Sequence, residues 1–273
     1  MRATCPLHIT GFFAIHKGDN EKTEGVSESV GCGVVVDDKA VTDVELGSGS
    51  IYINEEIESA PTTKSVVESL TDVRVDVKTR VGVPVSCGFG TSGAGAFSTA
   101  LALNELLSLG LTYGDLCNVA TRAEIKNKTG VGDVIAQSIG GVVIRGLTHV
   151  DKIPIGAQDI SYVIFGPLST SEILKDAGLM KIVGSCGNKC LKTLLKRPVF
   201  EEFMKLSREF AFNTGLISDK VKDAVEAVEA SGGLASMVML GDAIFAVDSL
   251  EVLREFGEVR DTRINNCGAN LVL

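Results

Sequence analysis

Hydrophobic residues alternate with polar ones in several parts of the first half of this chain, and elsewhere they recur every three or four residues. The alternating and β-branched runs predict strands over residues 2–16, 30–36, 40–46, 50–53, 73–81 and 142–145. The helical spacing predicts helices over residues 62–70, 96–109, 113–127 and 134–139. Gly11 is expected to break the first strand, Asp37 and Asp38 to turn the chain between the next two, and the polar residues 17–29 to form a loop.

The second half mixes helices and strands without strict alternation. Strands are predicted over residues 160–165, 235–240 and 243–247, with a further strand pattern at the end of the chain. Helices are predicted over residues 171–182, 199–213, 219–230 and 250–255. Between the halves, residues 152–158 lose the pattern and contain Pro154 and Gly156, which predicts a loop. We therefore expect an α+β fold with two domains, residues 1–155 and residues 156–273.

A glycine-rich stretch, residues 84–97 (PVSCGFGTSGAGAF), joins the strand over 73–81 to the first long helix. Its glycines at 88, 90, 93 and 95 leave the backbone almost free of side chains, so several N–H groups can converge on one anion where the helix begins. This predicts a phosphate-binding loop. The alternative is that the glycines only let the start of the helix pack closely against its neighbours.

Residues 88–93 satisfy the pattern GxGxxG, which dinucleotide-binding folds and protein kinases share. A dinucleotide fold needs an acidic residue about 20 positions further on, at a strand end, but Asp115 opens a predicted helix. A protein kinase needs a strand lysine soon afterwards, but the next lysine is Lys126 on a helix. A Walker A loop needs a lysine within the loop, and this stretch has none. What is left is a loop that holds phosphate with backbone N–H groups and the hydroxyls of Thr91 and Ser92.

The composition and charge of the chain exclude several classes of binding partner. The 273 residues carry a formal net charge of −9, which argues against binding to nucleic acid because that requires a positive surface. No window of about 18 apolar residues suggests a membrane span, and no signal-peptide pattern is visible. We therefore expect a cytoplasmic protein that acts on small molecules. The seven cysteines are scattered and odd in number, which favours reduced thiols over a disulfide framework.

Three motifs in this chain resemble those of the GHMP kinase superfamily and occur in the same order. The second superfamily motif, a proline followed after a few residues by Gly-Leu-Gly-Ser-Ser-Ala, corresponds to Pro84, Gly88, Phe89, Gly90, Thr91, Ser92 and Ala94, with Gly93 as an extra residue. The first motif corresponds to Pro6, His8, Ile9, Thr10, Phe12 and Phe13, and the third to Ala235, Ser236, Met239, Leu240 and Gly241. The first and third motifs are closest to those of the archaeal pantoate kinase branch.

The resemblance implies a two-domain GHMP-kinase-like fold, with the glycine-rich phosphate loop in a mixed α/β N-terminal domain and a ferredoxin-like C-terminal domain. It implies a kinase that uses ATP and Mg²⁺ to phosphorylate a small alcohol, and the archaeal branch implies that this alcohol is pantoate, in coenzyme A biosynthesis. Another superfamily kinase, acting on mevalonate, homoserine or shikimate, is the first alternative. A non-catalytic nucleotide-binding regulator with the same fold is the second. A homodimer is expected from the superfamily alone.

The same resemblance assigns the catalytic groups. Residues 84 and 88–94 would bind ATP, and Ser92 would bind Mg²⁺ or phosphate. Glu124, in the predicted helix over 113–127, matches the glutamate that holds Mg²⁺ in superfamily members, and Asp133 matches the catalytic aspartate. From the residues alone, Ser92 and Asp133 are also explained as helix N-caps, and Glu124 as a solvated helix residue.

A substrate with a carboxylate, such as pantoate, needs a cation, and a guanidinium can bind a carboxylate through two hydrogen bonds. Arg145, at the end of the strand over 142–145, is our prediction for that role. An exposed arginine at a strand end is the alternative. His8 and His16, both in the first motif, are predicted to bind the substrate carboxylate or hydroxyls. Ser29 lies in a small-residue segment that the resemblance places near the substrate.

Overall fold

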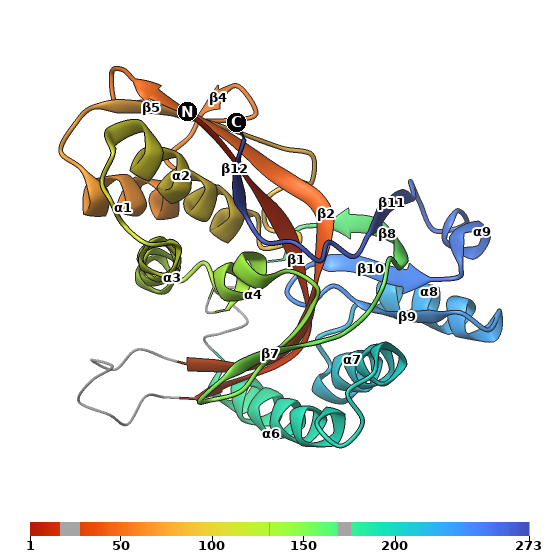
Figure 1. The fold of residues 1–273 in the computed structure, drawn as a ribbon. Coiled ribbons are helices and arrows are strands. Elements are labelled where there is room, and N and C mark those ends of the chain that lie inside the picture. Colours follow the sequence, from red (N-terminus) through yellow and green to blue (C-terminus); the bar gives the residue numbers. More distant parts are fainter. Residues whose placement is uncertain (17–27, 131, 169–175, 273) are drawn as a thin grey trace.

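The computed structural model describes residues 1–16, 28–130, 132–168 and 176–272, and the structural statements below concern these residues. They form two β-sheets with helices packed around them (Figure 1). Within this described part, the larger sheet has eight strands in parallel and antiparallel pairs, and the smaller has four antiparallel strands. The predicted α+β class is therefore confirmed. Most of the loop predicted over residues 17–29 lies outside the described residues.

The larger sheet is built mostly from the first half of the chain. Its strands are β1 (Arg2–His16), β2 (Glu28–Leu46), β3 (Ile51–Ile53), β4 (Glu56–Ile57), β5 (Val75–Val81), β6 (Val142–Arg145), β7 (Val150–Ile153) and β12 (Asn270–Val272). Their order is β12-β1-β2-β5-β3-β4, while β6 pairs with the first part of β2 and carries β7 on its other edge. Strand β7 overlaps the segment that we predicted as a loop, so that part of the prediction was wrong.

Strand β2 is continuous where the sequence predicted two strands joined by a turn. Both of its halves pair with β1, and one of the two register shifts in this pairing lies at Asp37 and Asp38. These two residues form a bulge, which bends a strand without ending it. Turn-forming residues look alike in a bulge and in a hairpin, and it is the pairing with β1 on both sides that decides between the two.

A second bulge lies at Gly11, where the sequence predicted a break in the first strand. The pairing of β1 with β2 skips one residue between Thr10 and Phe12. A Cβ at Gly11 would collide with the ring of Phe203, on helix α7 (Phe200–Thr214). Glycine at this position therefore lets the helix pack directly on the strand.

Most of the helices agree with the predicted ranges, with one exception. Besides α7, they are α1 (Pro61–Leu70), α2 (Thr91–Leu107), α3 (Tyr113–Asn127), α4 (Asp133–Ile139), α6 (Ala177–Leu194), α8 (Asp219–Ala230) and α9 (Leu250–Leu253). Helix α2 begins at Thr91 rather than at Ala96, so its first turn lies inside the glycine stretch. Helix α6 is the exception, because it runs beyond the predicted helix over 171–182, whose first residues lie outside the described part. Among the helices described, none has the length and apolar content needed to cross a membrane.

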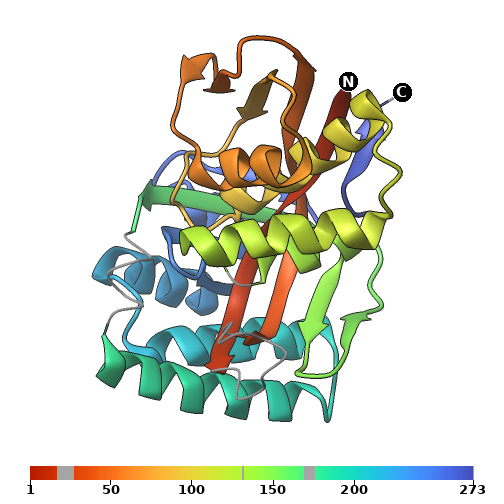
Figure 2. The same ribbon diagram turned by 90° about the vertical axis from the view of Figure 1, so that its left-hand side faces the viewer.

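Two groups of helices meet at β1 and β2. Helices α1, α2 and α3 pack against one another, and α2 lies on both strands. Figure 2 shows α3 crossing in front of the two strands, with α6 and α7 stacked near the end of β1. Helix α6 contacts β1 and β2, while α7 contacts β1 and also the smaller sheet. The first two strands therefore connect the layers of the molecule.

The smaller sheet is built from the second half of the chain. Its strands are β8 (Asp159–Gly166), β9 (Leu234–Met237), β10 (Asp242–Val247) and β11 (Arg260–Arg263), in the order β11-β8-β10-β9. The helices α6 to α8 come between β8 and β9, and α9 comes between β10 and β11. This β-α-β-β-α-β order supports the ferredoxin-like layer, which stays a prediction. After it the chain returns, and β12 pairs with β1; the division at residue 155 also stays a prediction.

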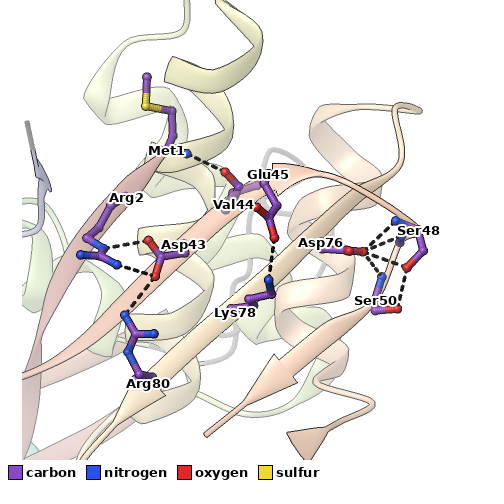
Figure 3. A network of polar contacts seen from close by, with 11 residues as sticks. Met1, Arg2, Asp43, Val44, Glu45, Ser48, Ser50, Asp76, Lys78 and Arg80 are labelled. Carbon is purple, nitrogen blue, oxygen red and sulfur yellow. Dashed lines mark hydrogen bonds and ion pairs between the residues drawn. The ribbon is translucent and has the colours of Figure 1, made fainter. Parts of the chain in front are cut away.

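Exposed charged side chains mark the solvent side of β1, β2 and β5 (Figure 3). Asp43 of β2 accepts hydrogen bonds from Arg2 of β1 at 2.7 and 2.9 Å and from Arg80 of β5 at 3.0 Å. The hydrogen bond from Arg2 is the main reason why the pKa of Asp43 lies below its usual value. The neighbouring Thr42 instead bonds to Ser98 of α2 at 2.6 Å, on the buried side. Exposed ion pairs add little stability, but their alternation with buried residues fixes which face of the sheet covers the core.

One testable contact is the approach of α6 to β1. A Cβ at Gly187 of α6 would collide with the backbone carbonyl of Phe13, whereas a Cβ at Gly184, one turn earlier, would meet open space. We expect Gly187→Ala to lower the free energy of unfolding by about 1–3 kcal/mol, because the helix must move away from the strand. The matched control Gly184→Ala should raise it by about 0.5–1 kcal/mol, the helical advantage of alanine. Urea denaturation measures both, and equal stability gains in the two variants would contradict the close packing.

Candidate active site

A cavity of about 640 Å³ opens between the glycine stretch, the start of α4 and one face of β1, β2 and β6. The start of α1 and the turn at residues 239–240 complete its lining. The cavity brings together most of the predicted site residues, namely His8, Ser29, Gly88, Phe89, Gly90, Thr91, Ser92, Asp133 and Arg145. Because these residues come from segments far apart in the sequence, their meeting in one cavity makes it the candidate active site.

The glycine stretch reaches the cavity in a sharply turned conformation. Gly88 and Gly90 have φ angles of 84° and 60°, in the left-handed region that glycine adopts without strain. Gly90 is the N-cap of α2, and within the described residues no side chain caps this helix. Since Thr91 and Ser92 line the cavity, the N–H groups and the positive dipole end of the first turn face it. The N-cap explanation of Ser92 was therefore wrong, because Ser92 lies inside the first turn.

Neighbouring segments hold this loop in place. The carbonyl oxygen of Phe89 accepts a hydrogen bond from the backbone N–H of His8 at 3.1 Å. The buried Phe89 ring packs against Tyr162 of β8, with ring centroids 4.9 Å apart. A Cβ at Gly88 would lie 2.7 Å from the carbonyl oxygen of Met239, so the loop touches the turn that carries the third motif. All three sequence motifs are thus in direct contact.

Asp133 and His8 form a close pair at the cavity. Nδ1 of His8 lies 2.7 Å from Oδ1 of Asp133, and their side chains are only 7% and 20% exposed. Asp133 is the first residue of α4, whose N-cap is Gly132. The explanation of Asp133 as an N-cap was therefore wrong. Its carboxylate is held by the histidine instead, and Asp133 lines the cavity, where a ligand can reach it.

Glu124 lies in α3 and is almost completely buried, with 1% of its surface exposed. Within the described part of the chain, neither carboxylate oxygen has a hydrogen-bond partner. Burial raises the pKa of Glu124 well above its usual value, and the negative charge of Asp133 raises it further, while the backbone N–H of Val134 acts in the opposite direction. The explanation of Glu124 as a solvated helix residue was wrong.

Two glycines leave space around the Glu124 carboxylate. A Cβ at Gly130 would lie 2.6 Å from Oε1 of Glu124 and 3.0 Å from Oδ2 of Asp133. A Cβ at Gly93, in the first turn of α2, would lie 3.0 Å from the same Oε1. The two carboxylates therefore lie close together, against Gly93 and Gly130 and near a helix N-terminus that favours negative charge. Glu124 is not one of the residues that line the cavity, but buried carboxylate oxygens without partners suit a hard cation.

Arg145 and Ser29 meet on the other side of Asp133. Nη1 of Arg145 donates a hydrogen bond to Oγ of Ser29 at 3.0 Å. A Cβ at Gly132 would lie 2.9 Å from that Oγ and 3.2 Å from Nη1. A guanidinium and a hydroxyl thus lie beside the residue that precedes Asp133, where they can receive a carboxylate.

Several predicted residues lie outside the cavity lining. Pro84 is exposed, whereas Gly93 and Ala94 are buried beneath the first turn of α2. His16 faces α6 instead, with its Nε2 3.1 Å from Oδ1 of Asn188. The role of His16 in substrate binding therefore stays a prediction without support from the cavity lining.

Comparisons with known proteins place this site in a family. Residues 61–141 match the sequence model described as the GHMP kinases N terminal domain. A pantoate kinase from Methanocaldococcus jannaschii is 35% identical over 261 residues, which cover 92% of this chain and 93% of the relative. The chain belongs to the pantoate kinase family of the GHMP kinases.

Similarity over nearly the whole length distinguishes this family from its neighbours. A solved structure titled "Phosphotransferase related to CoA biosynthesis pathway" superposes with a TM-score of 0.84 and 29% identity, and the match covers 99% of this chain and 98% of that one. A homoserine kinase from Methanocella arvoryzae is 32% identical, but only over 34% of this chain and 33% of that protein. The fold is therefore the GHMP kinase fold in the form that the pantoate kinase family shares.

Sequence reasoning missed part of the lining in this pantoate kinase family member. Residues 58–63, at the start of α1, and residues 127–130, after α3, both border the cavity. The first segment has no pattern that would have singled it out. The second ends at Gly130, and the pair Thr129-Gly130 before Asp133 was the only signal of a tight turn there.

The buried Glu124 carboxylate allows a stability test. Its raised pKa means that the folded protein holds this proton more tightly than the unfolded chain, so its contribution to stability falls as the pH rises above ~4.3, the ordinary value for glutamate. In EDTA at pH 8, Glu124→Gln should therefore melt at least ~2 °C above the natural protein, the shift typical of about 1 kcal/mol at this size. The difference should shrink as the pH falls towards ~4.3, because the unfolded chain then takes up the proton as well.

The matched control is Glu105→Gln, at an exposed position of α2. Its melting temperature should equal that of the natural protein at both pH values, as measured by circular dichroism. A Glu124→Gln protein that melts below the natural one at pH 8 would show that the carboxylate has a stabilising partner.

Proposed function

We propose that this protein transfers the γ-phosphoryl group of ATP to the primary hydroxyl of pantoate and forms 4-phosphopantoate, a step of coenzyme A biosynthesis. The observation that carries the proposal is the meeting of the glycine loop, the Asp133–His8 pair and Arg145 in one cavity. Similarity over 92% of the chain to a protein named pantoate kinase supports the choice of substrate. We also propose that it acts in the cytoplasm as a homodimer, with domains at residues 1–155 and 156–273.

The glycine loop is the proposed site of the ATP phosphates. Backbone N–H groups in the first turn of α2 and the hydroxyls of Thr91 and Ser92 can donate to phosphate oxygens. The contacts of Phe89 with His8 and Tyr162 support a loop that is already in position before ATP binds. Phosphoryl transfer depends mainly on such positioning and on neutralisation of charge.

Glu124 and Ser92 are the proposed ligands of Mg²⁺, with Asp133 beside them. The unpartnered oxygens of Glu124, close to Asp133 at the cavity, fit an ion that prefers oxygen ligands. Among the described residues no group of three histidine, cysteine or acidic side chains could hold a metal; Mg²⁺ is commonly bound by one or two carboxylates together with substrate phosphates. When bound, Mg²⁺ would neutralise charge on those phosphates.

Asp133 is the proposed proton acceptor. As the substrate hydroxyl oxygen forms its bond to the γ-phosphorus and the bond to the ADP oxygen breaks, Oδ2 of Asp133 can take up the hydroxyl proton. With its proton on Nδ1, His8 donates to Oδ1 of Asp133 and keeps the carboxylate turned to the cavity. Arg145 and Ser29 can bind the substrate carboxylate, which places the hydroxyl at the other end of the molecule towards Asp133.

A substrate panel tests this function. The purified protein is given ATP and Mg²⁺ with pantoate, mevalonate, homoserine or shikimate in parallel, and ADP release is followed. Of the four alcohols, we expect only pantoate to give ADP release above the background rate. A guanidinium that can bind its carboxylate and a carboxylate that can accept its hydroxyl proton both line the cavity. ADP release with homoserine but not with pantoate would contradict the proposal that pantoate is the substrate. No ADP release with any of the four alcohols would favour a nucleotide-binding regulator.

Substitution of the proposed proton acceptor gives a second test. Asp133→Asn should lower kcat by at least ~100-fold, since general base catalysis contributes about that much, while the Kd for ATP changes by less than ~10-fold. The matched control is Asp223→Asn at an exposed position of α8, which should retain normal kcat. Steady-state kinetics and nucleotide titration give the two values, and full activity of Asp133→Asn would remove this residue from the mechanism.

A further inference from the structure

Three neighbouring strands place an apolar residue, a glycine and the proposed carboxylate-binding arginine in one row. Phe13 of β1 pairs with Gly31 of β2, and Gly31 pairs on its other side with Arg145 of β6. The next row pairs Ile15 with Ser29. Side chains of directly paired residues lie on the same face of a sheet, and this is the face on which Arg145 meets Ser29.

The bulge at Gly11 determines which residues of β1 face the cavity. In a regular strand every second residue shares a face, so His8 and Thr10 would be followed on that face by Phe12. The extra residue at Gly11 shifts this alternation by one position. Phe13 and Ile15 therefore continue the row of His8 and Thr10, and all four line the cavity. Phe12 also borders it, with its ring packed on Phe203 and Phe210 of α7.

Gly31 occupies the centre of the row and lines the cavity. It adds no side chain between Phe13 and Arg145. A Cβ at Gly31 would collide with the carbonyl oxygen of Phe12, so the β1–β2 pairing itself requires glycine there. Phe13 is fixed in turn by Phe210 of α7, with ring centroids 5.7 Å apart. The row thus has an apolar end at Phe13 and a cationic end at Arg145.

We propose that Phe13 and Ile15 form an apolar wall that selects a substrate with a branched hydrocarbon centre between its carboxylate and its reacting hydroxyl. This inference rests on the proposed function and specifies how the substrate is recognised. Phe13, Ile15, Gly31, Arg145 and Asp133 line the same cavity, so a substrate with its carboxylate on Arg145 and its hydroxyl at Asp133 would place the carbons between them near the wall. The dimethyl carbon of pantoate fills that position with apolar surface.

The same wall disfavours related alcohols that are linear or charged. A straight-chain hydroxy acid leaves the wall in contact with water and loses the gain from burying its methyl groups. Homoserine carries an ammonium group next to its carboxylate, and an apolar wall offers that group no hydrogen-bond acceptor. Selection therefore comes from the wall, whereas Arg145 and Asp133 serve any hydroxy acid of suitable length.

The test compares two substrates on the same protein. Pantoate and 2,4-dihydroxybutanoate differ only in the two methyl groups, and the ratio of their kcat/KM values measures how well the protein recognises the branched carbon. The natural protein should prefer pantoate at least ~10-fold, and Ile15→Ala should lower this preference by about 10-fold, chiefly through the KM for pantoate. Ile182→Ala, at an exposed position of α6 outside the cavity, is the matched control and should leave the ratio unchanged.

A second pair of variants separates polarity from size. Ile15→Val and Ile15→Thr have similar volumes, but threonine places a hydroxyl in the wall, so the threonine variant should lose more of the preference for pantoate. Partial unfolding lowers both activities of one preparation equally and does not alter their ratio. If both Ile15→Ala and Ile15→Thr keep a kcat/KM ratio within twofold of that of the natural protein, the proposed apolar wall is wrong. In that case, activity of the natural protein on pantoate would still support the proposed function. No phosphorylation of either acid by the natural protein would overturn both.

Discussion

The antiparallel pairing of β1 with β2 is the constraint on which the other contacts of this structure depend. The two strands run beside each other for almost the whole length of β1, through two bulges. Helices α2, α6 and α7 all pack on β1, and β12 pairs with its first residues. The backbone of β1 also bonds to the glycine loop through His8 and to the third motif through Thr10. One strand pair therefore positions the three motifs relative to one another.

The site depends on close approaches that only glycine permits. Gly88 lies against the turn at Met239, Gly93 and Gly130 lie against the Glu124 carboxylate, and Gly31 lies against the backbone of β1. At each of these positions a methyl group would occupy space that backbone or carboxylate now uses. The presence of Gly93 as an extra residue in the second motif thus has a physical explanation, because a glycine there lets the Glu124 side chain reach the first turn of α2.

Glu124 illustrates how a site can oppose stability. A buried carboxylate without a hydrogen-bond partner is unfavourable in a folded protein, and the nearby charge of Asp133 increases the cost. The positive end of α2 offsets part of it. A cation bound between the two carboxylates and the ATP phosphates would offset more, which links the stability of this region to the proposed ligands.

The sequence by itself determined the local structure and the chemical groups. The ranges of α3 and α8 were predicted to the residue, because amphipathic spacing and capping residues act within a few turns. The start of α2 was missed, because glycine is a poor helix former and the helix begins there through contacts with other segments. The motifs identified Ser92, Glu124 and Asp133 as candidate site residues. The residues alone were also explained by helix N-capping or by exposure to solvent. The positions of Ser92 and Asp133 inside their helices and the burial of Glu124 exclude those explanations.

Only the tertiary structure decided which side chains share the cavity. In a regular strand His8 and His16 would face the same side, and both were predicted to bind substrate. The bulge at Gly11 reverses the alternation, so Ile15 lines the cavity and His16 turns to α6. Likewise, the pairing of β6 with β2 brings Arg145 to Ser29. Strand register depends on contacts between residues distant in sequence, and a shift of one position moves a side chain to the opposite face.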